Sequence, residues 1–156
     1  MKTILNRLIN HEILTKEEAR QVLLNISHGS YNESQIASFL TVYMMRSITI
    51  DELQGFREAL LEMCIRVDLS SHNTIDLCGT GGDGKNTSDN NHLNRCVDQA
   101  GIAILHAPLF HPAMKNVGKI RKDLAVKTFF NMLGPKVNQS IPQNQVVGVF
   151  NVERAR

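Results

Sequence analysis

The chain has 156 residues, a formal net charge of +2 and 42% hydrophobic residues. That is enough apolar material for one domain core, and the nearly balanced charge gives no argument for nucleic acid or a membrane surface as a partner. No apolar run approaches the ~20 residues of a membrane span, and the N-terminus lacks a signal-peptide core. The three cysteines are far apart, without metal-ligand spacing, and are expected to be free thiols in a reducing cytoplasm.

Residues 1–66 are expected to form a small helical bundle. Capping boxes, in which an N-terminal side chain and a Glu or Gln three positions later satisfy each other's backbone amides, begin at Thr15, Asn32 and Thr49. Apolar residues follow each of them at helical spacing, and a short helix over residues 4–9 precedes them. A bundle of this size buries its apolar surface poorly on its own, so we expect it to pack on another domain or a second copy.

The pattern changes after Ser70 to that of an α/β domain. Short apolar strands are expected over residues 74–78, 102–106 and 146–150, with a helix over 92–100 after the first of them. Strand, loop, helix and strand in this order are typical of a parallel sheet. The expected fold class is therefore α/β with an N-terminal helical bundle and a mostly parallel sheet of about three strands.

A glycine-rich loop directly follows the first expected strand. Four glycines fall within six positions, at Gly79, Gly81, Gly82 and Gly84. Without side chains in the way, backbone N–H groups can close around an anion there. Asp83 adds a carboxylate, which suits a phosphate that arrives with Mg²⁺. The alternative is a plain strand-to-helix turn that needs glycine for a positive φ, with Thr87 as an ordinary helix N-cap.

Residues 111–135 lie between the last two expected strands. Two short helices that stop at Gly134-Pro135 fit this block best. Arg121 stands in a run of lysines, and such a basic run is usually a solvated face. His111, which precedes a proline, can equally serve as a helix cap.

These residues carry a family resemblance. The loop over residues 79–87 resembles the diphosphate loop of anthranilate phosphoribosyltransferases, and the runs 107–117 and 121–135 are similar to further signatures of the same family. The N-terminal helices also match its helical domain. The glycine loop is only moderately specific for this family, because pyrimidine nucleoside phosphorylases share a related fold. The block over residues 111–135 is highly specific for the anthranilate enzymes.

The resemblance implies the transfer of a phosphoribosyl group from phosphoribosyl diphosphate (PRPP) to anthranilate, a step of tryptophan biosynthesis. It implies that a Mg²⁺-bound diphosphate is held by Gly79, Gly82, Asp83 and Thr87. It implies that anthranilate is bound by Arg121, His111, Gly134 and Pro135. The chemistry is consistent with these roles, because fixed amides and a metal stabilise a leaving diphosphate and a guanidinium suits a carboxylate.

The resemblance also implies the domain division and the assembly. Residues 1–70, joined by the helices near 112–134, would form the helical domain. Residues 71–111 and 135–156 would form a partial PRPP-binding α/β domain. Family members commonly pair through the helical domain, so a cytoplasmic homodimer is expected.

The sequence departs from the family pattern after Thr87. The family's Asn-x-Ser-Thr helix start, Lys-His-Gly-Asn loop and Gly-Ser-Ser-Asn-like stretch are not found, so an internal block is expected to be missing near residues 87–88. The family's Asp-Glu magnesium pair would lie beyond Arg156, which leaves the metal ligands unknown. We therefore expect impaired turnover in this shortened chain. The alternative is a non-catalytic helical dimerisation module that retains a vestigial phosphate loop.

Overall fold

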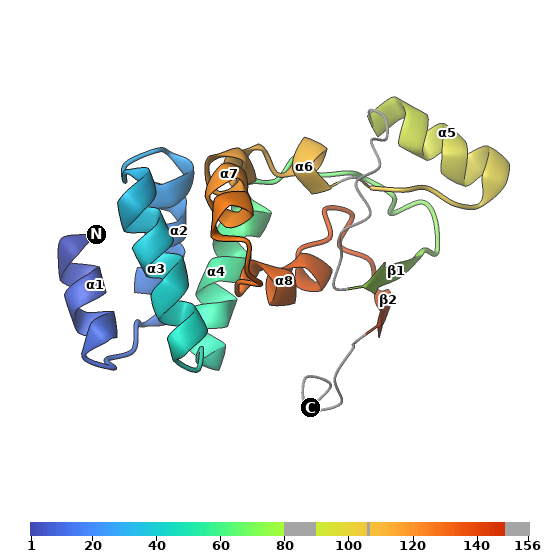
Figure 1. Ribbon diagram of the computed structural model, residues 1–156. Helices are drawn as coiled ribbons and strands as arrows, with labels where there is room; N and C mark the ends of the chain where they lie inside the picture. Colours follow the sequence, from blue (N-terminus) through green and yellow to red (C-terminus); the bar gives the residue numbers. More distant parts are fainter. Residues whose placement is uncertain (80–89, 106, 149–156) are drawn as a thin grey trace.

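The computed structural model describes residues 1–79, 90–105 and 107–148 (Figure 1). The N-terminal half holds four helices: α1 (Lys2–Ile9), α2 (Lys16–Ser27), α3 (Glu33–Met45) and α4 (Ile50–Met63). The rest of the chain holds strands β1 (Ile75–Gly79) and β2 (Asn144–Gly148) and helices α5 (Asn90–Ala100), α6 (Ala107–Phe110), α7 (Lys115–Leu124) and α8 (Phe130–Leu133). Two 3₁₀ turns, η1 (Pro112–Met114) and η2 (Gly134–Lys136), precede α7 and follow α8.

The three expected capping boxes are confirmed. The side chains of Thr15, Asn32 and Thr49 each accept a hydrogen bond from the amide three residues later, and the reciprocal bond is present in every case. No described helix is both long and apolar enough to cross a bilayer.

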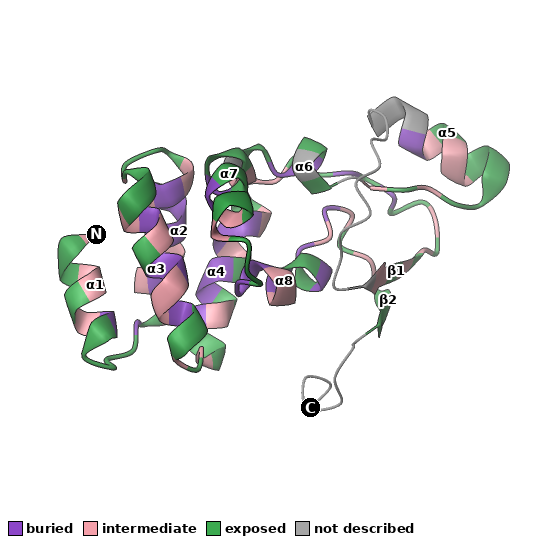
Figure 2. Cartoon of the chain, in the orientation of Figure 1, coloured by how far each residue is buried: buried purple, intermediate pink, exposed green. Residues whose placement is uncertain are grey.

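The main core lies where the four N-terminal helices meet α7 and α8, the region in which buried residues gather in Figure 2. Phe129, just before α8, stacks on Phe56 of α4 with 4.7 Å between ring centroids and meets Phe39 of α3 edge-on at 6.2 Å. The chain segment from α7 to α8 is thus anchored in the aromatic centre of the bundle, although it is more than 50 residues away in sequence from α4.

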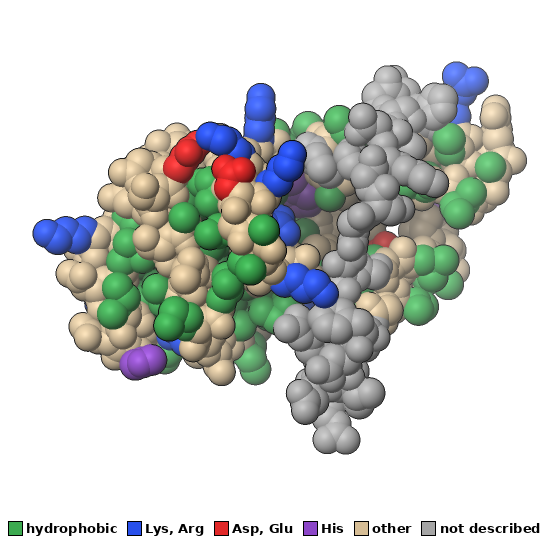
Figure 3. All heavy atoms as spheres, viewed as in Figure 1, with side chains coloured by type: hydrophobic (Ala, Val, Ile, Leu, Met, Phe, Trp, Pro, Cys, Tyr) green, Lys and Arg blue, Asp and Glu red, His purple; other side chains and the backbone are tan. Residues whose placement is uncertain are grey.

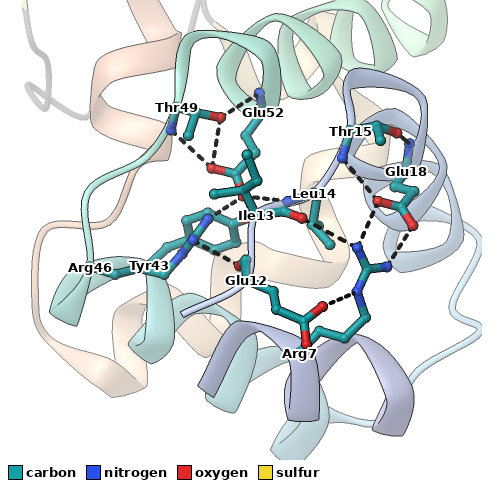
Figure 4. Close-up of polar contacts among 10 residues, drawn as sticks. All are labelled: Arg7, Glu12, Ile13, Leu14, Thr15, Glu18, Tyr43, Arg46, Thr49 and Glu52. Carbon is teal, nitrogen blue, oxygen red and sulfur yellow. Dashed lines mark hydrogen bonds and ion pairs between the residues drawn. The ribbon is translucent and has the colours of Figure 1, made fainter. Parts of the chain in front are cut away.

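A buried carboxylate joins the ends of three helices. The side chain of Glu52, on the first turn of α4, is fully buried and accepts hydrogen bonds from the Leu14 amide at 3.0 Å and the Tyr43 hydroxyl at 2.8 Å (Figure 4). It also accepts bonds from the Thr49 amide at 2.9 Å and hydroxyl at 3.0 Å, and it pairs with the buried guanidinium of Arg46. Burial alone would raise the pKa of Glu52, but these hydrogen bonds outweigh it and hold the pKa below its ordinary value.

The sheet contains two strands in the part of the chain that the structure describes. β1 and β2 pair in parallel, with Ile75 opposite Asn144 and Gly79 opposite Gly148, which confirms the parallel sheet. The strand expected over residues 102–106 is wrong for 102–105: these residues form no strand, and the side chains of Ile102 and Ile104 are 64% and 60% exposed. A short apolar run indicates a buried strand only if a neighbouring strand is there to pair with it, and sequence alone does not supply that neighbour.

A second, smaller core holds α5 and α6 against residues 65–70. Its buried members are Val67, Leu69, Leu93 and Phe110. The amide of Ile65 donates to the Phe110 carbonyl at 2.7 Å, and that of Val67 donates to the Gln139 carbonyl at 3.3 Å. The first residues of the linker between the bundle and β1 are thus hydrogen-bonded to α6 and to the segment after η2.

Replacing each of two helical glycines by alanine is predicted to have opposite effects on stability. Gly55 lies where α4 crosses α2, and a Cβ built there would fall 2.2 Å from the Lys16 carbonyl oxygen, whereas a Cβ at Gly118 of α7 would meet none of the described residues within 4 Å. We expect Gly55→Ala to lower the free energy of unfolding by about 1–3 kcal/mol through overpacking. Gly118→Ala should raise it by about 0.5–1 kcal/mol, since alanine is the better helix former. Urea denaturation measures both, and equal effects would contradict the close helix crossing.

A second prediction concerns Glu52. Replacing it by Gln leaves the buried Arg46 guanidinium without a counter-charge, so Glu52→Gln should lower the free energy of unfolding by about 3–5 kcal/mol in urea denaturation at pH 7. The matched control is Glu58→Gln, because the ion pair of Glu58 with Lys16 is solvent-exposed and its loss should leave the unfolding midpoint almost unchanged.

The same variant has a predicted pH dependence. Because the folded pKa of Glu52 is lowered, its stabilisation is complete above the ordinary carboxyl pKa of 4.5 and is lost as the pH falls through the folded value. The wild-type stability should therefore fall more steeply below pH 4.5 than that of Glu52→Gln. Parallel pH profiles would show that Glu52 does not carry this stabilisation.

Candidate functional site

β1 delivers the chain into the glycine loop. Gly79 ends β1 and pairs with Gly148 of β2, so the loop begins at the edge where both parallel strands have their carboxyl ends. In open α/β sheets this edge is where ligands bind. Gly82, Asp83 and Thr87 lie outside the described residues, so their predicted roles remain predictions.

Arg121 is on the last turn of α7, which ends where Ala125 adopts a left-handed conformation. Its Nη2 lies 3.3 Å from the Asn131 Oδ1, and its guanidinium carbon lies 5.2 Å from the centre of the Phe130 ring. The residue is half-buried, and this burial lowers the pKa of the guanidinium. Among the described residues no carboxylate lies within ion-pair distance of it. Arg121 is thus distinct from its exposed lysine neighbours. Figure 3 shows basic side chains, Lys and Arg together, gathered over α7.

Asn131 fixes the position of that guanidinium. The same Oδ1 that faces Arg121 also accepts a hydrogen bond from the Thr128 amide at 3.2 Å, and the Asn131 amide donates to the Thr128 carbonyl at 3.0 Å. Sequence reasoning missed this residue. The signal available was the Thr-x-x-Asn spacing at the start of α8, in which the asparagine side chain satisfies an amide at a helix start.

His111 lies in the protein interior. It occupies the N-cap position of η1, but its side chain does not cap that turn; its Nε2 lies 3.0 Å from the Val137 carbonyl oxygen. Burial lowers the pKa of the imidazole, with the backbone carbonyls of Val137 and Leu60 acting in the opposite direction. The buried His111 side chain thus ties η1 to the segment after η2, and its burial favours the uncharged imidazole.

Gly134 and Pro135 form the turn after α8. A Cβ at Gly134 would meet nothing within 4 Å, so the described structure leaves open space beside it. Pro135 is buried and lines a groove of about 530 Å³ together with Lys136 and Gln145 on one side and Ile50, Leu53 and Arg57 of α4 on the other.

Of the residues predicted to bind anthranilate, neither Arg121 nor His111 lines this groove. The four residues predicted for anthranilate therefore do not surround one cavity in the described structure.

Gln145 connects this turn to the sheet, and sequence reasoning missed it as well. Its Nε2 donates to the Asp76 Oδ2 of β1 at 2.6 Å and to the Pro135 carbonyl oxygen. No local pattern indicates such a contact, because it depends on the pairing of two strands almost 70 residues apart in sequence.

The described residues supply no metal site. No group of three or more His, Cys, Asp or Glu side chains among them could hold an ion. The Mg²⁺ expected from the glycine loop therefore has no ligand set in this part of the chain.

Two family models match the chain. The helical bundle domain of a glycosyl transferase family matches residues 2–64, and the a/b domain of the glycosyl transferase family matches residues 87–156. Curated relatives include the anthranilate phosphoribosyltransferases of Flavobacterium johnsoniae, 60% identical, and Flavobacterium psychrophilum, 59% identical. Both alignments include all of this chain and 61% of the relative, so the chain spans about three-fifths of their length.

The alignments also bear on the expected missing block. They run over 200 positions whereas the chain has 156 residues, so about 44 aligned positions have no residue in this chain. This agrees with an internal block that the relatives have and this chain lacks.

Solved structures share the fold. The anthranilate phosphoribosyltransferase from Thermus thermophilus superposes with a TM-score of 0.79 at 24% identity, over 96% of this chain and 59% of that one. The enzyme from Saccharomyces cerevisiae in complex with PRPP and Mg gives a TM-score of 0.78 at 23% identity, over 97% and 57%. With both of its domains matched, the chain belongs to the glycosyl transferase family that joins a helical bundle domain to an a/b domain, and its curated relatives are anthranilate phosphoribosyltransferases.

Proposed function

We propose that this chain belongs to an anthranilate phosphoribosyltransferase, which transfers a phosphoribosyl group from PRPP to anthranilate in tryptophan biosynthesis. The observation that carries the proposal is the 60% identity to such an enzyme over every residue of the chain. Nothing in the comparisons favours the non-catalytic dimerisation module over the transferase. A structure neighbour in complex with PRPP and Mg supports Mg²⁺ as the cofactor of the diphosphate, and we assign no catalytic step to the metal.

Arg121 is our proposed recognition group for the anthranilate carboxylate. A half-buried guanidinium with no carboxylate partner among the described residues has lost hydration without gaining a counter-charge, so an incoming carboxylate would be bound favourably. Asn131 and Phe130 orient this group without neutralising it. His111, Gly134 and Pro135 complete the proposed anthranilate set, with His111 acting from within the core.

Gly79, Gly82, Asp83 and Thr87 are the proposed diphosphate set. Backbone amides that hold a leaving diphosphate stabilise the charge that develops when the ribosyl bond breaks. We propose that PRPP binding by these four residues survives in this chain while turnover is impaired.

The assembly and location are also proposals. Large apolar side chains are exposed on the helical half, among them Ile9, Ile13 and Met45, and they support pairing of two copies through this domain. A mass twice that of the chain in sedimentation equilibrium would establish the homodimer. The relatives' biosynthetic role supports a cytoplasmic location, which fractionation of the source cells tests.

The diphosphate proposal predicts PRPP binding that depends on Asp83. Titration calorimetry of the wild-type chain with PRPP and Mg²⁺ should give saturable binding, and Asp83→Ala should weaken it at least about tenfold, since a carboxylate that helps to hold the metal-bound diphosphate is lost. Asp51→Ala, which removes an exposed carboxylate from the helical bundle, is the matched control and should bind like the wild type. No binding by the wild type would favour the non-catalytic module.

The anthranilate proposal predicts a specific loss at Arg121. Arg121→Gln should weaken anthranilate binding, measured by fluorescence titration with PRPP and Mg²⁺ present, by about 10–100-fold, because a charge-assisted hydrogen bond contributes about 1.5–3 kcal/mol. Lys122→Gln removes an exposed cation from the next position and should leave the affinity unchanged. Equal losses in both variants would point to a general electrostatic effect and contradict a specific role for Arg121.

A further inference from the structure

The two faces of the sheet differ in character. Side chains alternate along each strand, and Asp76 is paired with Gln145 in the parallel register, so these two side chains share one face. The opposite face carries Ile75, Leu77 and Val146, which are 60%, 74% and 59% exposed. The polar face is the one that reaches Pro135.

The carboxamide of Gln145 links three parts of the chain. Its nitrogen carries two hydrogens, and two acceptors lie within reach: the Asp76 Oδ2 at 2.6 Å and the Pro135 carbonyl oxygen. The Cys78 Sγ of β1 lies 3.4 Å from the same nitrogen. Gln145 thus holds its own strand, the neighbouring strand and the turn after α8 together.

The parts that Gln145 joins are those to which the proposed function assigns the two substrates. β1 ends at Gly79, the first residue of the proposed diphosphate set, and Pro135 belongs to the proposed anthranilate set. The backbone ladder already fixes Gly79 against Gly148. The Gln145 side chain adds a direct polar link from this pair of strands to Pro135.

We propose that Gln145 is a positioning residue that holds the Gly134–Pro135 turn against β1 and thereby sets the separation of the two proposed substrate segments. Its importance for the reaction rests on the proposed function, whereas its effect on the turn does not. Transfer between two bound substrates requires the reacting atoms to lie about 3–3.5 Å apart, so a small displacement of one segment lowers the rate sharply.

Amide hydrogen exchange measured by mass spectrometry tests the link without any substrate. Gln145→Leu keeps the side-chain bulk and removes both donors, so exchange in the segment 134–137 should become about tenfold faster, as expected when a stabilising hydrogen bond is lost locally. Exchange in α2 and α4, which the link does not touch, should stay unchanged. Gln143→Leu, an exposed glutamine two residues earlier, is the matched control and should leave the segment 134–137 as in the wild type.

A rescue variant distinguishes the loss of the hydrogen-bond donors at position 145 from a change in side-chain size. Gln145→Lys restores a donor that can reach both the Asp76 carboxylate and the Pro135 carbonyl, so it should recover part of the protection in 134–137. Unchanged exchange in Gln145→Leu, or equal acceleration in Gln143→Leu, would overturn the inference. So would faster exchange throughout the helical bundle, because that result indicates a general loss of stability.

Substrate affinities and kcat of Gln145→Leu test whether the Gln145 link contributes to the reaction. Gln145→Leu should leave the affinities for PRPP with Mg²⁺ and for anthranilate within about twofold while it lowers kcat at least about tenfold, since an effect on positioning appears in the transition state. If the wild type binds neither substrate, the proposed function fails, and the exchange experiment still decides whether Gln145 holds the turn. If exchange responds as expected but kcat of an active wild type does not, Gln145 is structural and its positioning role is wrong.

Discussion

The buried carboxylate of Glu52 is the constraint on which the helical half depends. It accepts hydrogen bonds from the loop after α1, through Leu14, and from α3, through Tyr43. It also binds the junction between α3 and α4, through Arg46 and Thr49. An uncompensated charge at this depth would cost several kcal/mol, so all of these donors must be in place together. The network makes the ends of three helices one cooperative unit, and α7 and α8 pack on that unit.

The proposed substrate segments are supported unequally by this arrangement. Phe129 stacks on Phe56 in the bundle core, and Arg121 and Asn131 lie on either side of it in sequence, so the rigidity of the bundle extends to the guanidinium. The sheet has much less support, because parallel sheets are normally covered on both faces and here Leu77 is 74% exposed. Contacts that tie the sheet to better-packed segments therefore matter more than they would in a fully covered sheet.

Whether an interaction could be predicted from the sequence depends on how far apart its residues are along the chain. The capping boxes at Thr15, Asn32 and Thr49 need only residues three positions apart, and all three were predicted and confirmed. The buried role of Glu52 was missed, because its local part in the capping box gives no sign of Leu14 or Tyr43. The strand expected near Ile104 was wrong and the link from Gln145 was missed for the same reason: strand pairing joins residues that sequence spacing does not relate. In the candidate site, the motif residues were found through resemblance, but Asn131, which holds one of them, was not.

Both residues that hold the proposed substrate segments are neutral carboxamides, and this choice has a chemical consequence. A carboxylate at position 131 would orient Arg121 equally well, but it would also form an ion pair with the guanidinium and weaken its attraction for an anionic substrate. Asn131 accepts from Arg121 at 3.3 Å and leaves its charge available. Gln145 acts in a similar way but as a hydrogen-bond donor. It donates to Asp76 and to the Pro135 carbonyl without adding a charge beside the loop proposed to hold diphosphate. Uncharged side chains can thus fix the geometry of a site for two anionic substrates while the electrostatic attraction is left for the substrates themselves.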